Sequence, residues 1–392
     1  MIAGTPVLDL DDVASLEAAD TGGTLRSAAS GGAQVRATAA AVAEGVLTRL
    51  RDMRPRSLVI VTGAGRAARA AAILVAALGD RAALPIVAVT AIPQWVGPLD
   101  VVLVAGDDAG DPRVIGAIDR ALHRGAEVVV AAPEEGPLRT AAAGRAVVLP
   151  PRVPVLDHNR LLRYLAIGIA VLQAVDPAHI EPLTPDLDVL ADALDAEALR
   201  DGPTNEVFHN PAKTLAVRMQ QRSVVLSGDA PAAAQVAGHI AEVLLSAAGQ
   251  ICAAAELAQV AAAHGLLSAT AGAAAPGFDP LFHDEELDGP APVRRVGLFV
   301  LSADADQLAA HRRLGIFAGG SGLIDAEVAN VDTELIAGQP GAPGPGTSRP
   351  ASELEQLAVL ALRFETAAAY LRLLGGPATP ADRSAHYDGG HF

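Results

Sequence analysis

The chain has 392 residues, enough for two domains of ordinary size, and a formal net charge of −16. So acidic a chain lacks the basic surface that binding to nucleic acid requires, and it is poorly suited to anionic membranes. Apolar residues make up 51% of the chain and aromatic residues only 3%, so we expect a core of Ala, Val, Leu and Ile.

Residues 1–50 are expected to form a helical extension. Val42, Val46 and Leu50 follow helical spacing near its end. The first residues show no basic segment followed by an apolar one, and the longest apolar stretches fall short of the roughly 20 residues that span a bilayer. We therefore expect no signal peptide, no membrane span and a cytoplasmic location.

A regular alternation of short and long segments begins near residue 57. Short runs of Val, Leu and Ile alternate with longer Ala-rich segments, at residues 58–61, 86–89, 101–104, 128–130 and 147–149. Strands separated by helical crossovers predict a parallel sheet with helices on both faces. Residues 160–175 are expected to form a buried helix within this unit, which we place at residues 51–200.

The pattern restarts near Lys213, after a proline-rich stretch. A helix is followed by a strand at 224–226, helices at about 232–247 and 253–263, and a strand at 296–301. These segments predict a second doubly wound unit at residues 201–350, with a loop over 272–292. The single cysteine, Cys252, falls in the second helical run, where we expect a buried, inert thiol; one cysteine excludes an internal disulfide and fits a reducing compartment.

Residues 351–392 are expected to hold a docking helix and a tail. Residues 352–374 have the pattern of an amphipathic helix that must pack on the rest of the chain. A Pro/Gly linker at 338–350 precedes it, and residues 375–392 are expected to be disordered.

Three stretches resemble a known family. The segment 210–216, Asn-Pro-Ala-Lys-Thr-Leu-Ala, resembles the start of the second half of bifunctional phosphoglucose/phosphomannose isomerases. Residues 354–376 resemble the long helix near their C-terminus, and Gly63-Ala64-Gly65 has the place expected in a sugar isomerase (SIS) domain. The chain most resembles the divergent TobH-like members. The resemblance implies an α/β fold of two tandem doubly wound SIS domains with a C-terminal helix, in a homodimer.

The resemblance also implies an activity. Members of the family interconvert aldose and ketose 6-phosphates, such as those of glucose and mannose, and need no metal or redox cofactor. A glutamate moves a proton between C1 and C2, loops rich in Ser and Thr hold the phosphate, and a histidine and a lysine assist. Such chemistry demands a base with a pKa near the working pH and donors that neutralise a dianion.

The loop that holds the phosphate in the family differs here. Its aligned stretch at 105–112, Ala-Gly-Asp-Asp-Ala-Gly-Asp-Pro, has three carboxylates and no hydroxyl. Asp111 followed by proline fits the N-cap of a helix. A carboxylate about 4 Å from a phosphate charge costs roughly 4 kcal/mol near a protein surface, more than the ~0.3–1 kcal/mol that a helix dipole supplies. We therefore expect Asp107 and Asp108 to line an acidic crevice that disfavours phosphate.

The family's catalytic base is also missing at its aligned position. Glu242 on the same predicted helix, and His264 farther along, are the substitutes that the spacing offers; the alternative is an exposed helix glutamate and a helix-terminal histidine. Lys213 is the only lysine in the chain, so none follows the C-terminal helix, where the family has a catalytic one. Lys213 itself is either a ligand contact or a first-turn helix residue.

The remaining candidates lie in turns and loops. Gly63 and Gly65, followed by Arg66, form a turn that holds a sugar ligand or simply reverses the chain; the third glycine of a dinucleotide fingerprint is missing. Ser227 is a candidate ligand contact in the corresponding turn of the second half. The cluster at 283–286, His-Asp-Glu-Glu, lacks the spacing of metal ligands, so we expect a solvated loop there and no metal.

Two functions stay open. The protein is either a glucose 6-phosphate/mannose 6-phosphate isomerase with a rearranged site, or a catalytically lapsed relative. In the second case it binds a sugar derivative or a protein partner and regulates mannose and sugar-nucleotide metabolism. The missing base, hydroxyls and lysine favour the second. A purely structural protein without a ligand pocket is the third, weaker alternative.

Overall fold

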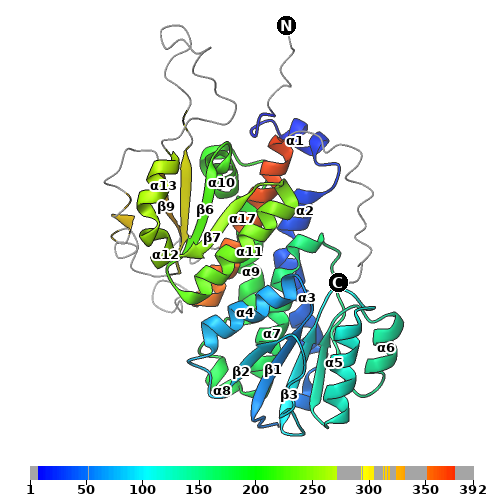
Figure 1. Cartoon of the computed structure of the whole chain (residues 1–392). Coiled ribbons are helices and arrows are strands. Elements are labelled where there is room, and N and C mark those ends of the chain that lie inside the picture. Colours follow the sequence, from blue (N-terminus) through cyan, green and yellow to red (C-terminus); the bar gives the residue numbers. More distant parts are fainter. Residues whose placement is uncertain are drawn as a thin grey trace, which may run out of the picture.

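The computed structural model describes residues 8–51, 53–271, 293, 295–303, 312, 314–315, 317, 324–331 and 351–375 (Figure 1). The expected loop at 272–292 with its His-Asp-Glu-Glu cluster, the linker at 338–350 and the tail from residue 376 lie outside these ranges. Two sheets, with helices around and between them, make up the described part of the chain (Figure 1).

The first sheet has five parallel strands in the order β2-β1-β3-β4-β5. The strands are β1 (Ser57–Thr62), β2 (Ile86–Val89), β3 (Asp100–Ala105), β4 (Glu127–Ala131) and β5 (Val147–Val148). Each matches a predicted run within one or two residues, because buried strands of a parallel sheet are apolar along their whole length.

Helices cover both faces of the first sheet. Helices α4 (Arg66–Leu78) and α7 (Leu161–Val175) pack on the face that carries Leu58 and Leu103. Helices α5 (Pro112–His123) and α6 (Gly136–Ala142) pack on the opposite face. The N-cap expected at Asp111 is confirmed, since its side chain accepts a hydrogen bond from the Arg113 amide at 2.8 Å.

The second sheet is also parallel, in the order β7-β6-β8-β9. Its strands are β6 (Ser223–Gly228), β7 (Cys252–Glu256), β8 (Val296–Leu301) and β9 (Ile324–Ala329). The order repeats that of β2-β1-β3-β4, so the two halves share one topology. Two expectations were wrong: residues 253–256 form a strand rather than the start of a helix, and β9 was not predicted.

Helices α10 to α13 cover the second sheet in the part of the chain that the structure describes. Helix α10 (Pro211–Met219) precedes β6, and Asn210 caps it by accepting from the Lys213 amide at 2.9 Å. Helix α11 (Pro231–Ala248) covers one face of the sheet and ends at Gly249, whose φ of +65° is the left-handed conformation that favours glycine. Helices α12 (Leu257–Ala262) and α13 (His264–Ala271) pack on the other face.

The N-terminal residues form helices, as expected, and these pack on both the first half and α17. Helices α1 (Val13–Ala19), α2 (Thr24–Ala29) and α3 (Gly31–Ala43) are followed by the short η1 (Thr48–Leu50). Helix α3 lies against α7 and α9 (Leu187–Arg200), while η1 contacts α7. The short helix α8 (Pro177–Ile180) lies between α7 and α9 in the chain.

Helix α17 (Glu353–Leu374) runs through the middle of the molecule (Figure 1). It packs against α11, α10, α9 and α2, and nearly all of its residues are buried. The predicted docking is therefore confirmed, but the helix is buried on all sides rather than amphipathic. Among the described helices, none combines the length and the apolar composition that a membrane-spanning segment needs.

Candidate functional site

The loops after β1 and β3 meet at the carboxyl edge of the first sheet. These two strands are neighbours, and the chain leaves them in opposite directions, to β2 on one side and to β4 on the other. Such a switch in strand order opens a crevice outside the strand ends, where doubly wound proteins bind ligands. The predicted ligand residues Gly63, Gly65, Asp107 and Asp108 all lie in these two loops.

Both glycines of the first loop have a local reason to be glycine. Gly65 has φ +96° and ψ −149°, a conformation that other residues rarely adopt. At Gly63 a Cβ atom would lie 3.3 Å from the Asp111 Oδ2 atom, so a side chain there would press on the loop after β3. At Gly65 a Cβ atom would lie 3.8 Å from the Asp107 Oδ2 atom. The two loops therefore form one surface.

Asp107 is held by two residues at the start of α7, the N-cap residue Arg160 and Tyr164 in the first turn. The Tyr164 hydroxyl donates to its Oδ1 atom at 2.5 Å, and the Arg160 guanidinium lies 3.0 Å from the same oxygen. Burial and the Asp107 charge raise the pKa of Tyr164, so the phenol keeps its proton and stays a donor. The Asp107 charge is thus compensated inside the protein.

The other two carboxylates of this loop serve local structure. Asp108 accepts from the Gly110 amide at 2.7 Å, and Asp111 caps α5. Both act on their own loop, as short acidic side chains do in turns and at helix starts. The crevice that the sequence predicts to be acidic therefore carries less free negative charge than its three aspartates suggest.

A cavity of about 360 Å³ opens beside Asp107. We call it the arginine cavity; its walls come from Pro133 after β4, residues 151–155 after β5, Asp107, Arg160 and Arg163. Three of the lining residues are arginines, and Asp107 is the only carboxylate among them. Burial lowers the pKa of Arg163, whose guanidinium stacks 4.9 Å from the centre of the Tyr164 ring and donates to the Leu149 carbonyl at 2.7 Å.

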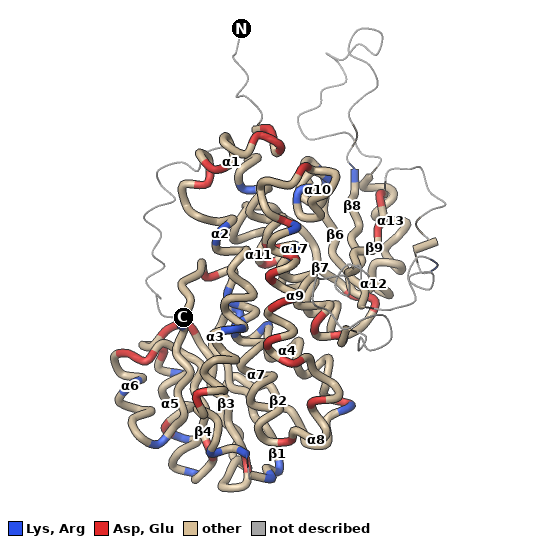
Figure 2. Tube along the Cα trace, turned by 180° about the vertical axis from the view of Figure 1, so that it is seen from behind, with Lys and Arg blue, Asp and Glu red and all other residues tan. Residues whose placement is uncertain are grey.

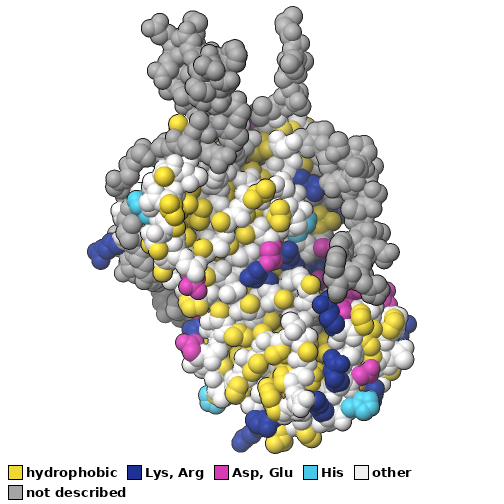
Figure 3. Space-filling view, viewed as in Figure 1, with side chains coloured by type: hydrophobic (Ala, Val, Ile, Leu, Met, Phe, Trp, Pro, Cys, Tyr) yellow, Lys and Arg dark blue, Asp and Glu magenta, His cyan; other side chains and the backbone are white. Residues whose placement is uncertain are grey.

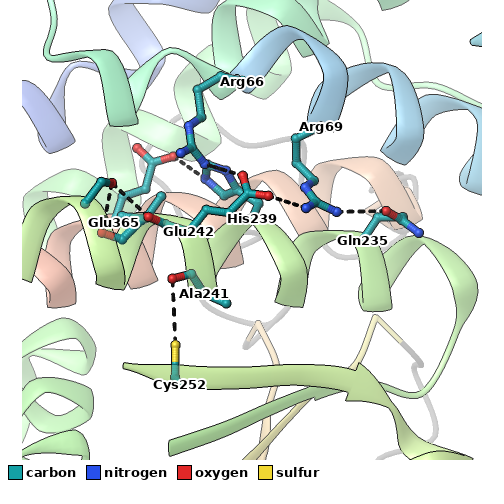
Figure 4. Close-up of polar contacts among 10 residues, drawn as sticks. Arg66, Arg69, Gln235, His239, Ala241, Glu242, Cys252 and Glu365 are labelled. Carbon is teal, nitrogen blue, oxygen red and sulfur yellow. Dashed lines mark hydrogen bonds and ion pairs between the residues drawn. The ribbon is translucent and has the colours of Figure 1, made fainter. Parts of the chain in front are cut away.

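Glu242 and Arg66, two predicted site residues, meet between the halves (Figure 4). Arg66 from α4 lies 2.8 Å from the Glu242 Oε2 atom, and Arg69, one turn on, pairs with Oε1. Arg69 also donates to Gln235 at 3.1 Å. The Glu242 side chain is 40% exposed, yet each of its oxygens faces a guanidinium. Glu242 is therefore the centre of an ion-pair cluster that joins α4 to α11.

A buried histidine lies directly behind this cluster (Figure 4). The Arg66 guanidinium lies 3.3 Å from the His239 Nδ1 atom, and His239 Nε2 lies 2.8 Å from the Glu365 carboxylate on α17. Because a guanidinium can only donate, Nδ1 is the acceptor and Nε2 carries the hydrogen given to Glu365. Glu365 also accepts from Asn159 at 2.7 Å. His239 and Glu365 are almost completely inaccessible to solvent.

Sequence reasoning missed this pair. His239 and Glu365 lie 126 residues apart in two apolar helices, so no local spacing connects them. One signal was present: a histidine and a glutamate inside otherwise apolar helical runs need partners, because an unpaired buried polar group is costly. That signal indicates that partners exist without indicating which they are.

Lys213 has a structural role, because its contacts are all to the protein itself among the described residues. Its side chain is buried, and the ammonium donates to the carbonyls of Pro203 and Asn205 at 2.9 and 2.6 Å. It also lies 5.7 Å from the centre of the Tyr370 ring, within range of a cation–π interaction. Burial lowers the pKa of Lys213, with Asp11 opposing the shift. These contacts account for the lysine without a ligand.

His264 and Ser227 lie in the second half and make no contact with the Glu242 cluster among the described residues. The His264 ring stands at 5.4 Å, edge to face, from Phe317, and its Nε2 atom lies 3.5 Å from the Ser268 hydroxyl. Ser227, at the end of β6, is buried, and its hydroxyl has no hydrogen-bond partner among the described residues. The structure thus joins Glu242 to Arg66 and not to His264.

Cys252 is not a reactive thiol, and the described residues form no metal site. Cys252 is half-buried on β7, rather than in a helix, and its Sγ atom lies 3.7 Å from the Ala241 carbonyl (Figure 4). Burial raises the pKa of the thiol to about 11, so it stays protonated at neutral pH. The described residues contain no group of His, Cys, Asp and Glu arranged to hold a metal ion.

Solved structures match this arrangement over most of the chain. Tagatose-6-phosphate ketose/aldose isomerase from Escherichia coli matches with a TM-score of 0.60 and 16% identity, covering 92% of this chain and 96% of that one. The fold is that of tandem SIS domains. The C-terminal domain of glucosamine-fructose-6-phosphate aminotransferase from Francisella tularensis gives a TM-score of 0.56 and 10% identity, over 90% and 96% of the two chains.

Comparison of amino-acid sequences alone does not detect the similarity to these proteins. No protein family profile matches the chain, and no curated protein matches it in sequence. At identities of 10–16% the similarity to the solved structures is a similarity of fold. The SIS fold expected from short motifs is confirmed. A shared fold does not establish a shared function, which depends on the residues of the site.

Proposed function

We propose that the protein binds a phosphorylated sugar or sugar derivative in the arginine cavity and does not isomerise it. The observation that carries this proposal is the lining of that cavity, with three arginines and one carboxylate at the carboxyl edge of a doubly wound sheet. The fold matches proteins whose names state that they act on sugar 6-phosphates, which supports this class of ligand.

The charges around the cavity suit a dianion. Arginine presents a planar fork of donors that matches phosphate oxygens, and its charge persists at all physiological pH values. Asp107 would oppose a phosphate, but Arg160 and the Tyr164 hydroxyl already engage it. Arg160 neutralises Asp107, so Arg152 and Arg163 leave the lining with a net positive charge. Among the described residues Arg152 is bound to Glu44 alone, at 2.6 Å on the surface, where the ion pair is weak and easily exchanged.

The surroundings of the candidate bases argue against isomerisation. Aldose–ketose isomerisation needs a carboxylate or imidazole free to take a proton beside C1 and C2. Both oxygens of Glu242 face arginines, and His239 is buried between Arg66 and Glu365. His264 contacts Ser268 and Phe317 instead. Glu242 and His239 are thus engaged by other side chains and His264 lies apart from them, which supports a catalytically lapsed protein.

Ligand-dependent stabilisation tests binding. Glucose 6-phosphate, mannose 6-phosphate and fructose 6-phosphate are each titrated while the unfolding temperature is followed; a ligand that binds only the folded state raises it. We expect at least one sugar phosphate to stabilise the protein, with the unphosphorylated sugar ineffective. Arg152→Gln should weaken that ligand about tenfold or more, because it removes a charged hydrogen bond. Arg145→Gln, an exposed arginine whose Asp119 partner lies 4.0 Å away, is the matched control.

A coupled assay with fructose 6-phosphate separates the two hypotheses. We expect no turnover by the wild-type protein. Turnover that Glu242→Gln abolishes would establish the isomerase instead. Absence of stabilisation by all three sugar phosphates would refute the binding proposal itself.

The homodimer expected from the resemblance remains a prediction. Leu245 and Ile251 near β7 are exposed, with 59% and 83% of their surfaces accessible. β7 is also an edge strand of the second sheet, and apolar side chains are spread over the described surface of both halves in Figure 3. Exposed apolar side chains beside a sheet edge favour association. Light scattering on the purified protein checks the oligomeric state. A protein partner in mannose metabolism likewise stays a prediction.

A further inference from the structure

A second cavity, of about 620 Å³, lies at the amino edge of the first sheet. It is formed by the segment before β1, the segment before β2 and the junction of α7 with α8. The lining includes two arginines, three apolar residues and a histidine: Arg51, Arg54, Met53, Leu84, Val175 and His179. Helix α8 marks this place at the end of the molecule remote from the second sheet (Figures 1 and 2). We call it the amino-edge cavity.

The amino-edge cavity and the arginine cavity have no lining residue in common. The amino ends of parallel strands lie at the opposite edge of the sheet from their carboxyl ends. A ligand in the amino-edge cavity therefore would not touch the crevice between the β1 and β3 loops. Its volume lies in the range of small-molecule sites, roughly 300–1,000 Å³.

Two arginines on the wall of the amino-edge cavity stand out by their lack of partners. Arg51 and Arg54 are exposed, and neither has an ion pair or side-chain hydrogen bond with any other described residue. Other arginines at this end of the first half are paired: Arg49 with Glu127, Arg56 with Asp100, and Arg81 with Glu353. In a chain of net charge −16, two neighbouring unpaired cations create a local site for an anion.

The rest of the wall is largely apolar. Leu84 and Val175 are buried beneath it, and Met53 is half-buried beside them. Apolar walls with a few charged groups are the usual composition of small-molecule sites. An inorganic anion alone would leave these walls in contact with water, so they favour a ligand with an apolar body.

One further polar pair borders the amino-edge cavity. The His179 Nδ1 atom lies 2.7 Å from the Asp176 carboxylate, which fixes the orientation of the ring. The Nε2 atom has no partner among the described residues, so it is available to a ligand. A ring held in place by a carboxylate offers a hydrogen bond at little entropic cost.

We propose that the amino-edge cavity binds an organic anion. Its carboxylate, phosphate or sulfonate group would pair with Arg51 and Arg54, and its apolar body would lie against Met53, Leu84 and Val175. The proposal is independent of the proposed sugar site, because the two cavities lie at opposite edges of the sheet and have separate linings.

The fluorescent sulfonate 8-anilinonaphthalene-1-sulfonate tests the proposal, since it combines an anion with an aromatic body. Its fluorescence is titrated against the full-length protein and against Arg51→Gln/Arg54→Gln. We expect saturable binding that weakens about tenfold or more in the double variant. The matched control Arg139→Gln/Arg145→Gln removes the same charge from exposed positions around α6 and should bind as the wild type does.

A second variant fills the cavity without changing charge. Ala178 is an exposed wall residue, so Ala178→Trp should fold normally and lower the affinity for the dye by occupying the space. Equal dye affinity in the wild type and the Arg51→Gln/Arg54→Gln variant would overturn the proposal, as would an equal loss in the control. The stabilisation by sugar phosphate should be the same in all these variants, which keeps this test separate from that of the sugar site.

Discussion

Asp107 shows how much one carboxylate depends on residues far along the chain. Its loop after β3 could be read from the sequence, including its three acidic residues and the helix cap at Asp111. The partners Tyr164 and Arg160 come from a segment more than fifty positions later and carry no motif. Local sequence therefore predicted the residues of this loop correctly but not its charge balance.

The Tyr164–Asp107 bond can be tested alone. Tyr164→Phe removes one hydroxyl and leaves a carboxylate with fewer donors. Since a hydrogen bond to a charged group is lost, we expect the free energy of unfolding to fall by about 1.5–3 kcal/mol. Urea denaturation measures it. Tyr370→Phe is the comparison, because the Tyr370 hydroxyl donates to a neutral carbonyl, that of Asp201, at 2.7 Å. A smaller loss for Tyr164→Phe than for Tyr370→Phe would contradict the charge argument.

Secondary-structure elements differ in how well they can be predicted from the sequence. The strands of the first sheet are rich in Val, Leu and Ile and were found. Strand β7 consists of Cys252, three alanines and Glu256, residue types that are not typical of strands, and its pairing with β6 decides its conformation. Strand β9, Ile-Asp-Ala-Glu-Val-Ala, has an alternation of apolar and acidic residues that could have been recognised as a half-buried edge strand.

Helix α17 shows why polar residues do not always mark an exposed face. Its glutamates and arginines suggested a solvated side, yet Glu365 pairs with His239 and Arg363 with Glu197, both inside the protein. Burial of such charges is tolerated because each one is paired. Periodicity reveals a helix but cannot show which of its polar side chains have buried partners.

The start of α17 offers a test at the level of a single helix. Ser352 and Glu355 form a capping box, in which each side chain bonds to the backbone amide of the other. Ser352→Ala should lower the free energy of unfolding by about 1 kcal/mol, the usual worth of an N-cap. Chemical denaturation measures the loss. Ser246→Ala on α11 should change stability far less, because within the described ranges this hydroxyl bonds to carbonyls of its own helix alone.

For the molecule as a whole, the fold was more predictable than the packing that joins its two halves. Alternating segments and short motifs gave two parallel α/β units, and the repeated strand order agrees with them. One apolar core extends from the inner face of the first sheet to that of the second through α4, α7, α11 and α17. Sequence patterns describe segments singly, so they could not show that the two halves are joined in this way.

Stability should depend on pH through Asp201, which is buried near α17. Burial and the neighbouring Glu197 raise its pKa to about 8, from an ordinary value of 3.8. The folded protein thus binds a proton that the unfolded chain has released between these values. Its stabilising contribution is complete below about pH 4 and is lost as the pH rises through 8, by at most about 1.4 kcal/mol per pH unit.

Asp201→Asn isolates this effect. Asparagine can still accept from the Ala212 amide, which bonds to Asp201 at 3.1 Å, but it does not titrate. Denaturation at pH 5, 7 and 9 should show the variant gaining stability relative to the wild type as the pH rises. Asp80→Asn, at an exposed position, controls for the loss of a surface charge. Parallel stability curves for wild type and Asp201→Asn would show that Asp201 stays ionised.

The central position of α17 has a consequence for biosynthesis. Ribosomes make this helix after every strand of both sheets, so the grooves of α10, α11 and α9 that receive it stay open while the preceding chain is already outside the exit tunnel. The nascent chain therefore exposes apolar surface until α17 has been synthesised. Its yield in living cells should therefore respond strongly to chaperones that shield unfinished chains.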